Sequence, residues 1–230
     1  MKDKITKKQK DFYEKNKQEL TDSYLSDFPL HIDPDAVRDR FAPIGYDRTN
    51  VQNFQGICKV LTKDIFREAL KRNQGKVKKI IFAAGLPATG KTSHLKMMAQ
   101  NELIYDGTIN DEQKFIEFVQ MAIDMGYFIE VFVYNADPIR AFKSNLQRGD
   151  QTGRYVSISH YEKVANSINS REILLKKYFN DKIKFRNFEY TNFEGKQTKF
   201  TPIIVNRNEL KRIANRHRFS DSKKLQEVIN

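Results

Sequence analysis

The residues best suited to chemistry lie between Gly85 and Thr92. They spell Gly-Leu-Pro-Ala-Thr-Gly-Lys-Thr and match the phosphate-binding loop pattern G-x-x-x-x-G-K-[ST] at every fixed position. Gly85 and Gly90 permit backbone angles that turn successive N–H groups toward a phosphate. Lys91 supplies a positive charge for the outer phosphates, and the Thr92 hydroxyl suits a magnesium ion. The sequence therefore predicts a site for ATP or GTP.

The flanks of this loop favour the same interpretation. An apolar run, Ile80–Ala84, predicts a strand before the loop, and residues 91–100 predict a helix whose positive end faces the bound anion. The expected nucleotide contacts are the loop and the first helical residues: Gly85, Leu86, Pro87, Ala88, Thr89, Gly90, Lys91, Thr92 and Ser93.

Carboxylates follow two other short strands. After a strand ending at Ile32, Asp33 or Asp35 opens a helix that has Pro34 near its first turn. Two interpretations remain open: a helix cap, or a catalytic role for Asp35 at the end of a sheet strand. A second strand, within 102–108, ends near Asp106, where an acidic residue of a magnesium site is expected.

The polar stretch 148–154, Arg-Gly-Asp-Gln-Thr-Gly-Arg, begins and ends with an arginine. We expect a loop here, after a helix over 138–147. Arg148 and Arg154 suit a lid that closes on a transferred phosphate. Taken on its residues alone, a solvated turn is the favoured alternative.

Composition limits the class of protein. The chain has 230 residues, 39% hydrophobic, with a formal net charge of +12. It lacks an apolar run of about 18 residues, as a membrane span needs, and its lysine-rich N-terminus lacks the apolar segment of a secretory signal. The single Cys58 excludes an internal disulfide and suits a reducing cytosol. We therefore expect a soluble, cytoplasmic protein, whose charge fits nucleic acid, an anionic surface, polyphosphate ligands or a lysine-rich host composition.

The elements that must position these residues indicate an α/β fold. Helical patterns and β patterns alternate, which predicts a three-layer sandwich with a mainly parallel central sheet, of the phosphate-loop kinase type. Further helices are expected over 51–74, 111–125, 159–179, 208–217 and 222–229. Further strands are expected over 127–134, and as a hairpin-like pair over 182–190 and 199–205.

With these motifs in place, the sequence resembles the zeta toxin family of phosphate-loop kinases. The resemblance implies that Lys91 and Thr92 bind ATP and Mg²⁺, and that Asp35, the second aspartate of an Asp-x-Asp segment, is the catalytic base. Asp106-Gly107-Thr108 is similar to the family's Glu-Gly-Thr substrate-contacting strand end, with aspartate in place of glutamate.

The resemblance also assigns the two arginines. It makes Arg148 and Arg154 phosphate-binding residues, catalytic together with Asp35 and Lys91. Asp33, Asp106 and Thr108 become substrate contacts, while Thr92 and Asp106 become the metal residues.

The order of the motifs differs from the family. The Asp-x-Asp unit, which follows the phosphate loop in the family, precedes it here. The simplest interpretation is a circular permutation, in which the β-α unit 28–75 keeps its place in the sheet. The resemblance covers about residues 28–205, expected to be the kinase domain, between a basic N-terminal arm or helix, 1–27, and basic C-terminal helices, 206–230.

The expected activity is magnesium-dependent transfer of the γ-phosphoryl of ATP to a hydroxyl of a small nucleotide-type metabolite. The resemblance implies a substrate like UDP-N-acetylglucosamine, and a toxin or effector with an antitoxin or immunity protein as partner. An effector would act in the cytosol of a target cell. Alternatives are a polynucleotide 5′-hydroxyl kinase, which would use the positive charge, and a nucleotide-gated module that binds nucleic acid. Nucleic acid is thus a less favoured partner, and a membrane is not expected.

Overall fold

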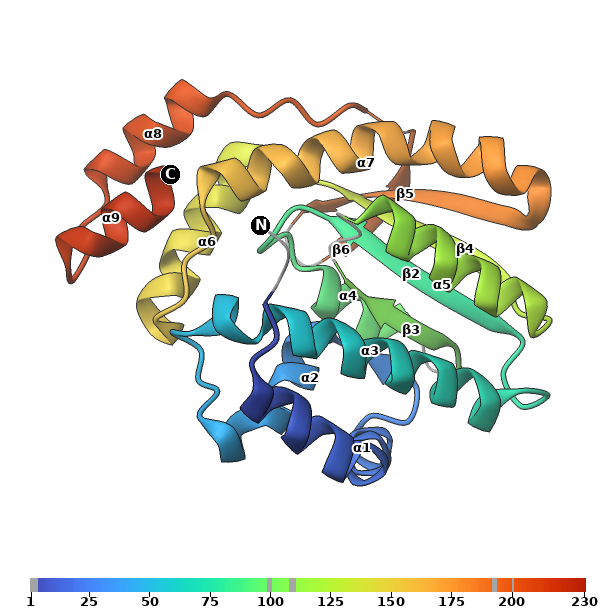
Figure 1. Cartoon of the computed structure of the whole chain (residues 1–230). Helices are drawn as coiled ribbons and strands as arrows, with labels where there is room; N and C mark the ends of the chain where they lie inside the picture. The colour runs from blue at the N-terminus through green and yellow to red at the C-terminus, as the bar shows by residue number, and fades with distance from the viewer. Residues whose placement is uncertain (1–3, 99–100, 108–110, 192–193, 200) are drawn as a thin grey trace.

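The computed structural model describes residues 4–98, 101–107, 111–191, 194–199 and 201–230. Its centre is a six-stranded sheet in the order β1-β3-β2-β4-β5-β6 (Figure 1). The strands are β1 (His31–Ile32), β2 (Lys79–Gly85), β3 (Leu103–Asp106), β4 (Phe128–Asn135), β5 (Ile183–Thr191) and β6 (Glu194–Thr198).

The first five strands in this sheet are parallel, and only β6 runs antiparallel to its neighbour. Ala83 of β2 pairs with Asp106 at the end of β3, and Gly85 pairs with Tyr134 near the end of β4. The carboxyl ends of these strands therefore meet at one edge, where α/β proteins place their ligands.

Helices supply the other two layers. They are α1 (Lys7–Asp27), α2 (Pro34–Arg38), α3 (Val51–Asn73), α4 (Lys91–Met98), α5 (Glu112–Asp124), α6 (Pro138–Thr152), α7 (Ile158–Phe179), α8 (Arg207–Arg216) and α9 (Ser222–Ile229), with short 3₁₀ segments η1 (Asp39–Ile44) and η2 (Asn180–Lys182). The mixed α/β architecture with a mainly parallel sheet is the predicted one.

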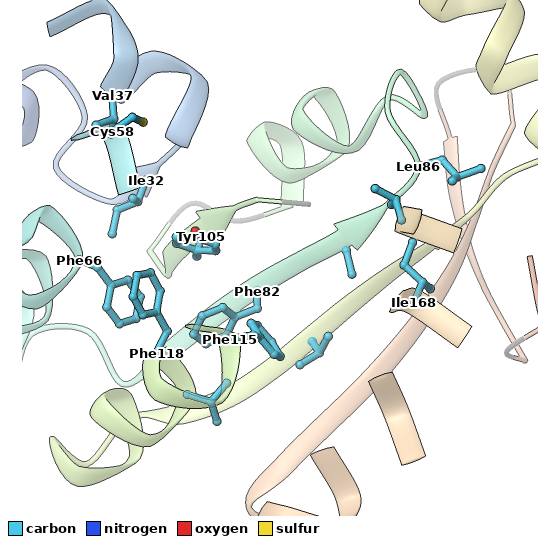
Figure 2. Close-up of a cluster of buried hydrophobic side chains, with 14 of the residues drawn as sticks. Ile32, Val37, Cys58, Phe66, Phe82, Leu86, Tyr105, Phe115, Phe118 and Ile168 are labelled. Carbon is cyan, nitrogen blue, oxygen red and sulfur yellow. The ribbon is translucent and has the colours of Figure 1, made fainter. Parts of the chain in front are cut away.

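The larger core lies between the sheet and the helices α3, α5 and α7. Phe66 of α3 stacks on Phe118 of α5, with ring centroids 4.3 Å apart, and Phe82 of β2 meets Phe115 edge to face at 5.0 Å. Figure 2 shows these rings together under the strands. A smaller core on the opposite face includes Leu95 of α4. Alternate residues of β2 enter the two cores, as a strand covered on both faces requires.

Two predicted elements were wrong at their ends. The expected loop 148–154 is mostly helix, because α6 continues to Thr152 and ends at Gly153, whose φ of +72° suits a helix C-cap. The expected second hairpin strand, 199–205, was also misplaced. The strand that pairs with β5 is Glu194–Thr198, and the residues described from 201 to 206 form neither helix nor strand.

The terminal helices pack on the body. Leu20, Tyr24 and Leu25 of α1 are buried, and α1 lies against α3 and η1. At the other end, α8 packs on α6 and α7 (Figure 1). Cys58 is a free, buried thiol. In the part of the chain that the structure describes, no helix has both the length and the apolarity to cross a bilayer.

Candidate active site

The predicted site residues gather where β1, β2 and β3 end. β1 leads to Asp33 and Asp35, β2 leads into the phosphate loop, and β3 ends at Asp106. β1 lies at the edge of the sheet, pairs with β3 and precedes the loop in the chain. The segments that follow β1, β2 and β3, although distant in sequence, thereby lie at the same edge of the sheet.

The phosphate loop has a left-handed backbone at Gly90, as predicted, but at Ala88 rather than at Gly85. Gly90 has φ of +82° and Ala88 has φ of +61°, a conformation that residues with a side chain rarely adopt. A Cβ on Gly85 would lie 2.9 Å from the Cβ of Tyr134, so the adjacent strand leaves no room for a side chain there. The Lys91 ammonium lies 3.5 Å from the Leu86 carbonyl oxygen. Lys91 is thus folded over the loop whose ligand it would neutralise.

Tyr161 of α7 braces the loop and was not predicted. Its side chain is fully buried, and its hydroxyl lies 2.8 Å from the carbonyl oxygen of Pro87 and 3.0 Å from that of Ala141. The hydroxyl ties the loop to the start of α6. In the sequence, Tyr161 is one aromatic residue on a helical apolar face, which predicts burial but not this contact.

Thr92 and Asp106 are in direct contact. The Thr92 hydroxyl donates to the Asp106 carboxylate at 2.6 Å, and His31 Nε2 lies 3.7 Å from the same oxygen. Burial disfavours ionisation of Asp106, but His31, the charge of Lys91 and the hydrogen bond from Thr92 outweigh it and lower the pKa of Asp106. The Thr92 hydroxyl at the start of α4 and the Asp106 carboxylate at the end of β3 are hard oxygen donors, the kind that Mg²⁺ prefers. Among the described residues, no group of three or more His, Cys, Asp or Glu is arranged to hold a metal.

Asp33 caps the helix that carries Asp35. Its carboxylate accepts a hydrogen bond from the Asp35 backbone N–H at 2.8 Å. Burial, together with the negative charges of Asp35 and Asp106, raises the pKa of Asp33 to about 6. The capping interpretation of Asp33 is therefore confirmed, and Asp33 also shares a crowded field of negative charge with Asp106.

Asp35 is held by two arginines. Arg154 donates to one carboxylate oxygen at 2.7 Å, and Arg38 donates to the other. Burial disfavours the charged form, but the charges of Arg154 and Arg38 prevail and lower the pKa of Asp35 to about 2. Arg38 also donates to Gln55 at 2.7 Å and is almost fully buried, whereas Arg154 is 28% exposed. Sequence reasoning missed Arg38 and Gln55.

Other predicted site residues have no side-chain contact described with Asp33, Asp35 or Asp106. Arg148 and Ser93 are exposed, on α6 and α4 respectively. His160, at the start of α7, lies in the field of Lys163, Arg154 and Asp35; burial and the two cations lower its pKa. Thr108 lies outside the described residues.

Comparison with known families adds a separate observation. Residues 99–187 match the family model described as Zeta toxin. The matched stretch runs from before β3 to within β5 and includes Asp106, Arg148 and Arg154. A search of the curated proteins found no match to the chain.

The phosphate loop lies outside the matched stretch, so the loop motif and the family match are two independent observations. The loop at 85–92 precedes the matched residues, and β2 that carries it lies between β3 and β4 of the matched stretch. The zeta toxin family has a phosphate-loop kinase fold, and the sheet has the predicted arrangement of that fold. The chain is thus similar to zeta toxins over residues 99–187.

Proposed function

We propose that this protein is a kinase that transfers the γ-phosphoryl group of ATP to a hydroxyl of a small nucleotide-type metabolite. One observation carries the proposal: the phosphate loop, the Thr92–Asp106 contact and the Asp35–Arg154 pair lie at one edge of the sheet. Phosphoryl transfer needs a phosphate cradle, a hard-cation site, mobile positive charge and a base for the acceptor.

Each group then has a role. Lys91 and the loop N–H groups hold the outer phosphates, and Thr92, with Asp106, holds Mg²⁺. When bound, the ion neutralises charge on the phosphate oxygens. Arg148 and Arg154 offset the negative charge of the transferred phosphoryl group. Asp35 accepts the proton of the acceptor hydroxyl.

The pairing of Asp35 with Arg154 has a mechanistic consequence. A carboxylate held by two arginines is ionised at neutral pH, but it accepts a proton poorly. Arg38 is buried beside it, whereas Arg154 has solvent access and a competing attraction to phosphate oxygens. We infer that bound phosphate draws Arg154 away from Asp35, which raises the proton affinity of Asp35 when the acceptor is present.

The resemblance to zeta toxins supplies the finer part of the proposal. It favours an acceptor like UDP-N-acetylglucosamine, a role as toxin or effector in the cytosol, and an antitoxin or immunity protein as partner. Permutation of the Asp-x-Asp unit belongs to the same proposal. It is supported by the place of β1 beside β3, which brings Asp33 within the electrostatic reach of Asp106 although the unit precedes the loop.

The test is the variant Asp35→Asn. The amide keeps the size of the side chain but removes the base, so we expect kcat to fall by about 100-fold or more, with little change in ATP affinity. Transfer of labelled γ-phosphate to UDP-sugars measures kcat. Titration calorimetry with a non-hydrolysable ATP analogue measures the affinity for the nucleotide.

The matched control is Asp39→Asn, an exposed carboxylate at the start of η1, which should leave both quantities unchanged. Retained turnover in Asp35→Asn would remove the base assignment. Loss of ATP binding or of folding would make Asp35 a structural residue that positions Arg154 and Arg38.

A second candidate function is favoured by the net charge of +12. A polynucleotide 5′-hydroxyl kinase, or a nucleotide-gated module that binds nucleic acid, would use this charge against a phosphate backbone. Both would keep the phosphate loop, and only the first would keep the base.

A further inference from the structure

The segment that carries Arg154 is fastened on its C-terminal side. The Tyr155 hydroxyl donates to the Asp150 carboxylate of α6 at 2.7 Å, and His217 Nε2 lies 3.0 Å from the same oxygen. The Phe219 ring packs on Tyr155 at 5.3 Å and on His217 at 4.7 Å, both nearly edge to face. Residues that follow α8 thus close over the residue next to Arg154.

The Tyr155 ring also lies close against the backbone of Gly149 in α6. A Cβ at position 149 would lie 2.2 Å from the ring, so only glycine allows this contact. The Tyr155 ring therefore contacts both the α6 backbone at Gly149 and the Phe219 ring.

Val156, which follows Tyr155, is also held by α6. Asn145 of α6 is fully buried, and its side-chain amide donates to the Val156 carbonyl at 3.1 Å and accepts from the Val156 N–H at 3.3 Å. Gly153 ends α6 on the other side of Arg154. The backbone of Arg154 is thus held at both ends, while its side chain reaches Asp35.

The C-terminal helices are firmly attached to the body that they brace. Leu210 and Ala214 of α8 and Val228 of α9 are buried in the main core. Arg207 of α8 pairs with Glu162 of α7. Both helices, α8 and α9, lie beyond 99–187, the stretch that matches the family model. Figure 1 shows the α8–α9 pair beside α6 and the start of α7.

We propose that the α8–α9 unit is a positioning device for the kinase site, in which Phe219 and His217 hold Tyr155 and thereby fix Arg154. This inference rests on the proposed function for its catalytic consequence. Tyr155, His217 and Phe219 are positioning residues, because they act on Arg154 through the backbone that joins it to Tyr155. A small displacement of a group that neutralises phosphoryl charge costs rate.

A double-mutant cycle tests the proposal in the full-length protein. Phe219→Ala removes the ring that covers Tyr155, and we expect kcat to fall about tenfold while the KM for ATP stays nearly constant. Phe219→Leu, which keeps apolar cover, should recover most of the loss. In an Arg154→Ala background, Phe219→Ala should lower kcat no further, because it acts only through Arg154.

The matched control is Arg216→Ala, an exposed residue in the last turn of α8, which should match the wild type. Multiplicative losses in the double variant, or full activity of Phe219→Ala, would overturn the proposal. If Phe219→Ala does not fold, Tyr155→Phe, which removes only the bond to Asp150, replaces it in the same cycle.

A second measurement separates this inference from the proposed kinase activity. The Nε–H signal of Arg154 in ¹⁵N NMR should have a distinct position in the wild type and in Arg216→Ala, and shift to the averaged position of exposed arginines in Phe219→Ala. If the wild type transfers no phosphoryl group but the signal shifts this way, the device stands and the kinase proposal fails. An unchanged signal in Phe219→Ala refutes the device.

Discussion

At the scale of single residues, the site contains two aspartates with opposite environments. Asp33 and Asp35 are two positions apart, yet the pKa is raised to about 6 in Asp33 and lowered to about 2 in Asp35. Asp33 is partly buried near the carboxylates of Asp35 and Asp106, whereas Asp35 pairs with two arginines. Neighbouring charge, not residue type, therefore separates the two.

Because the pKa of Asp33 is raised in the folded protein, the free energy of unfolding should depend on pH. Because the folded state favours protonated Asp33, its contribution is fully present below about pH 4 and is lost as the pH rises through about 6. Asparagine keeps the helix cap without the charge. We expect Asp33→Asn to raise the free energy of unfolding by about 1–2 kcal/mol at pH 7.5, and to give little gain near pH 4.

Urea unfolding of both proteins at the two pH values measures this difference. Asp221→Asn is a matched control, because Asp221 caps α9 with the same kind of contact, to the Lys223 N–H at 2.9 Å, outside the site. An equal gain for Asp33→Asn at both pH values would contradict the electrostatic account of Asp33.

The sequence indicated the residues of the site better than their contacts. The Asp35–Arg154 bond joins residues 119 positions apart. Local patterns do not encode such a distance, and only the resemblance to zeta toxins linked these residues to one task. Arg38 escaped notice because an arginine in a short helix is usually a solvated residue, whereas here it lies buried against Asp35.

At the scale of elements, prediction succeeded where a long periodic pattern or a strict motif decides the structure. α3 spans Val51–Asn73 and β4 spans Phe128–Asn135, close to the expected 51–74 and 127–134. It failed at the end of α6, because Gly149 and Asp150 resemble a turn in sequence. In the structure both residues contact Tyr155, which packs against Gly149 and donates to Asp150, and a local sequence pattern does not reveal these contacts.

Tyr161 gives a test of how α7 supports the phosphate loop. Tyr161→Phe keeps the ring but removes the hydroxyl that lies near the carbonyls of Pro87 and Ala141. A buried carbonyl without a partner costs about 1–3 kcal/mol, so we expect the free energy of unfolding to fall by about that amount. ATP affinity should also fall, because the loop is less well held.

Tyr178→Phe, an exposed position near the end of the same helix, is the control and should change neither quantity. Thermal unfolding and calorimetric titration with ATP measure both. If Tyr161→Phe loses stability but binds ATP as the wild type does, α7 supports the fold and not the nucleotide site.

At the scale of the whole molecule, the net charge of +12 separates the two candidate functions. A protein that makes six to ten phosphate contacts with nucleic acid loses about 10³–10⁵ in affinity between about 50 and about 200 mM salt. A small acceptor with few charges releases few counterions. We therefore expect the acceptor KM to change by less than about tenfold over this range.

Steady-state kinetics at several salt concentrations, with 5′-hydroxyl oligonucleotides and UDP-sugars as alternative acceptors, measure this dependence. A steep loss of affinity with salt, together with turnover of oligonucleotides, would favour the polynucleotide kinase. Tight, salt-sensitive binding of nucleic acid without turnover would favour the nucleotide-gated binding module.

In the proposed function, the phosphate loop serves phosphoryl transfer to a small metabolite. The most direct measurement incubates the purified protein with ATP and Mg²⁺ in an extract of small metabolites, with Lys91→Ala as control, and identifies the products by mass spectrometry. We predict that a nucleotide-type metabolite gains one phosphoryl group with the wild type and remains unmodified with Lys91→Ala. The same product with both proteins, or unchanged metabolites with a wild type that binds ATP, would contradict the account.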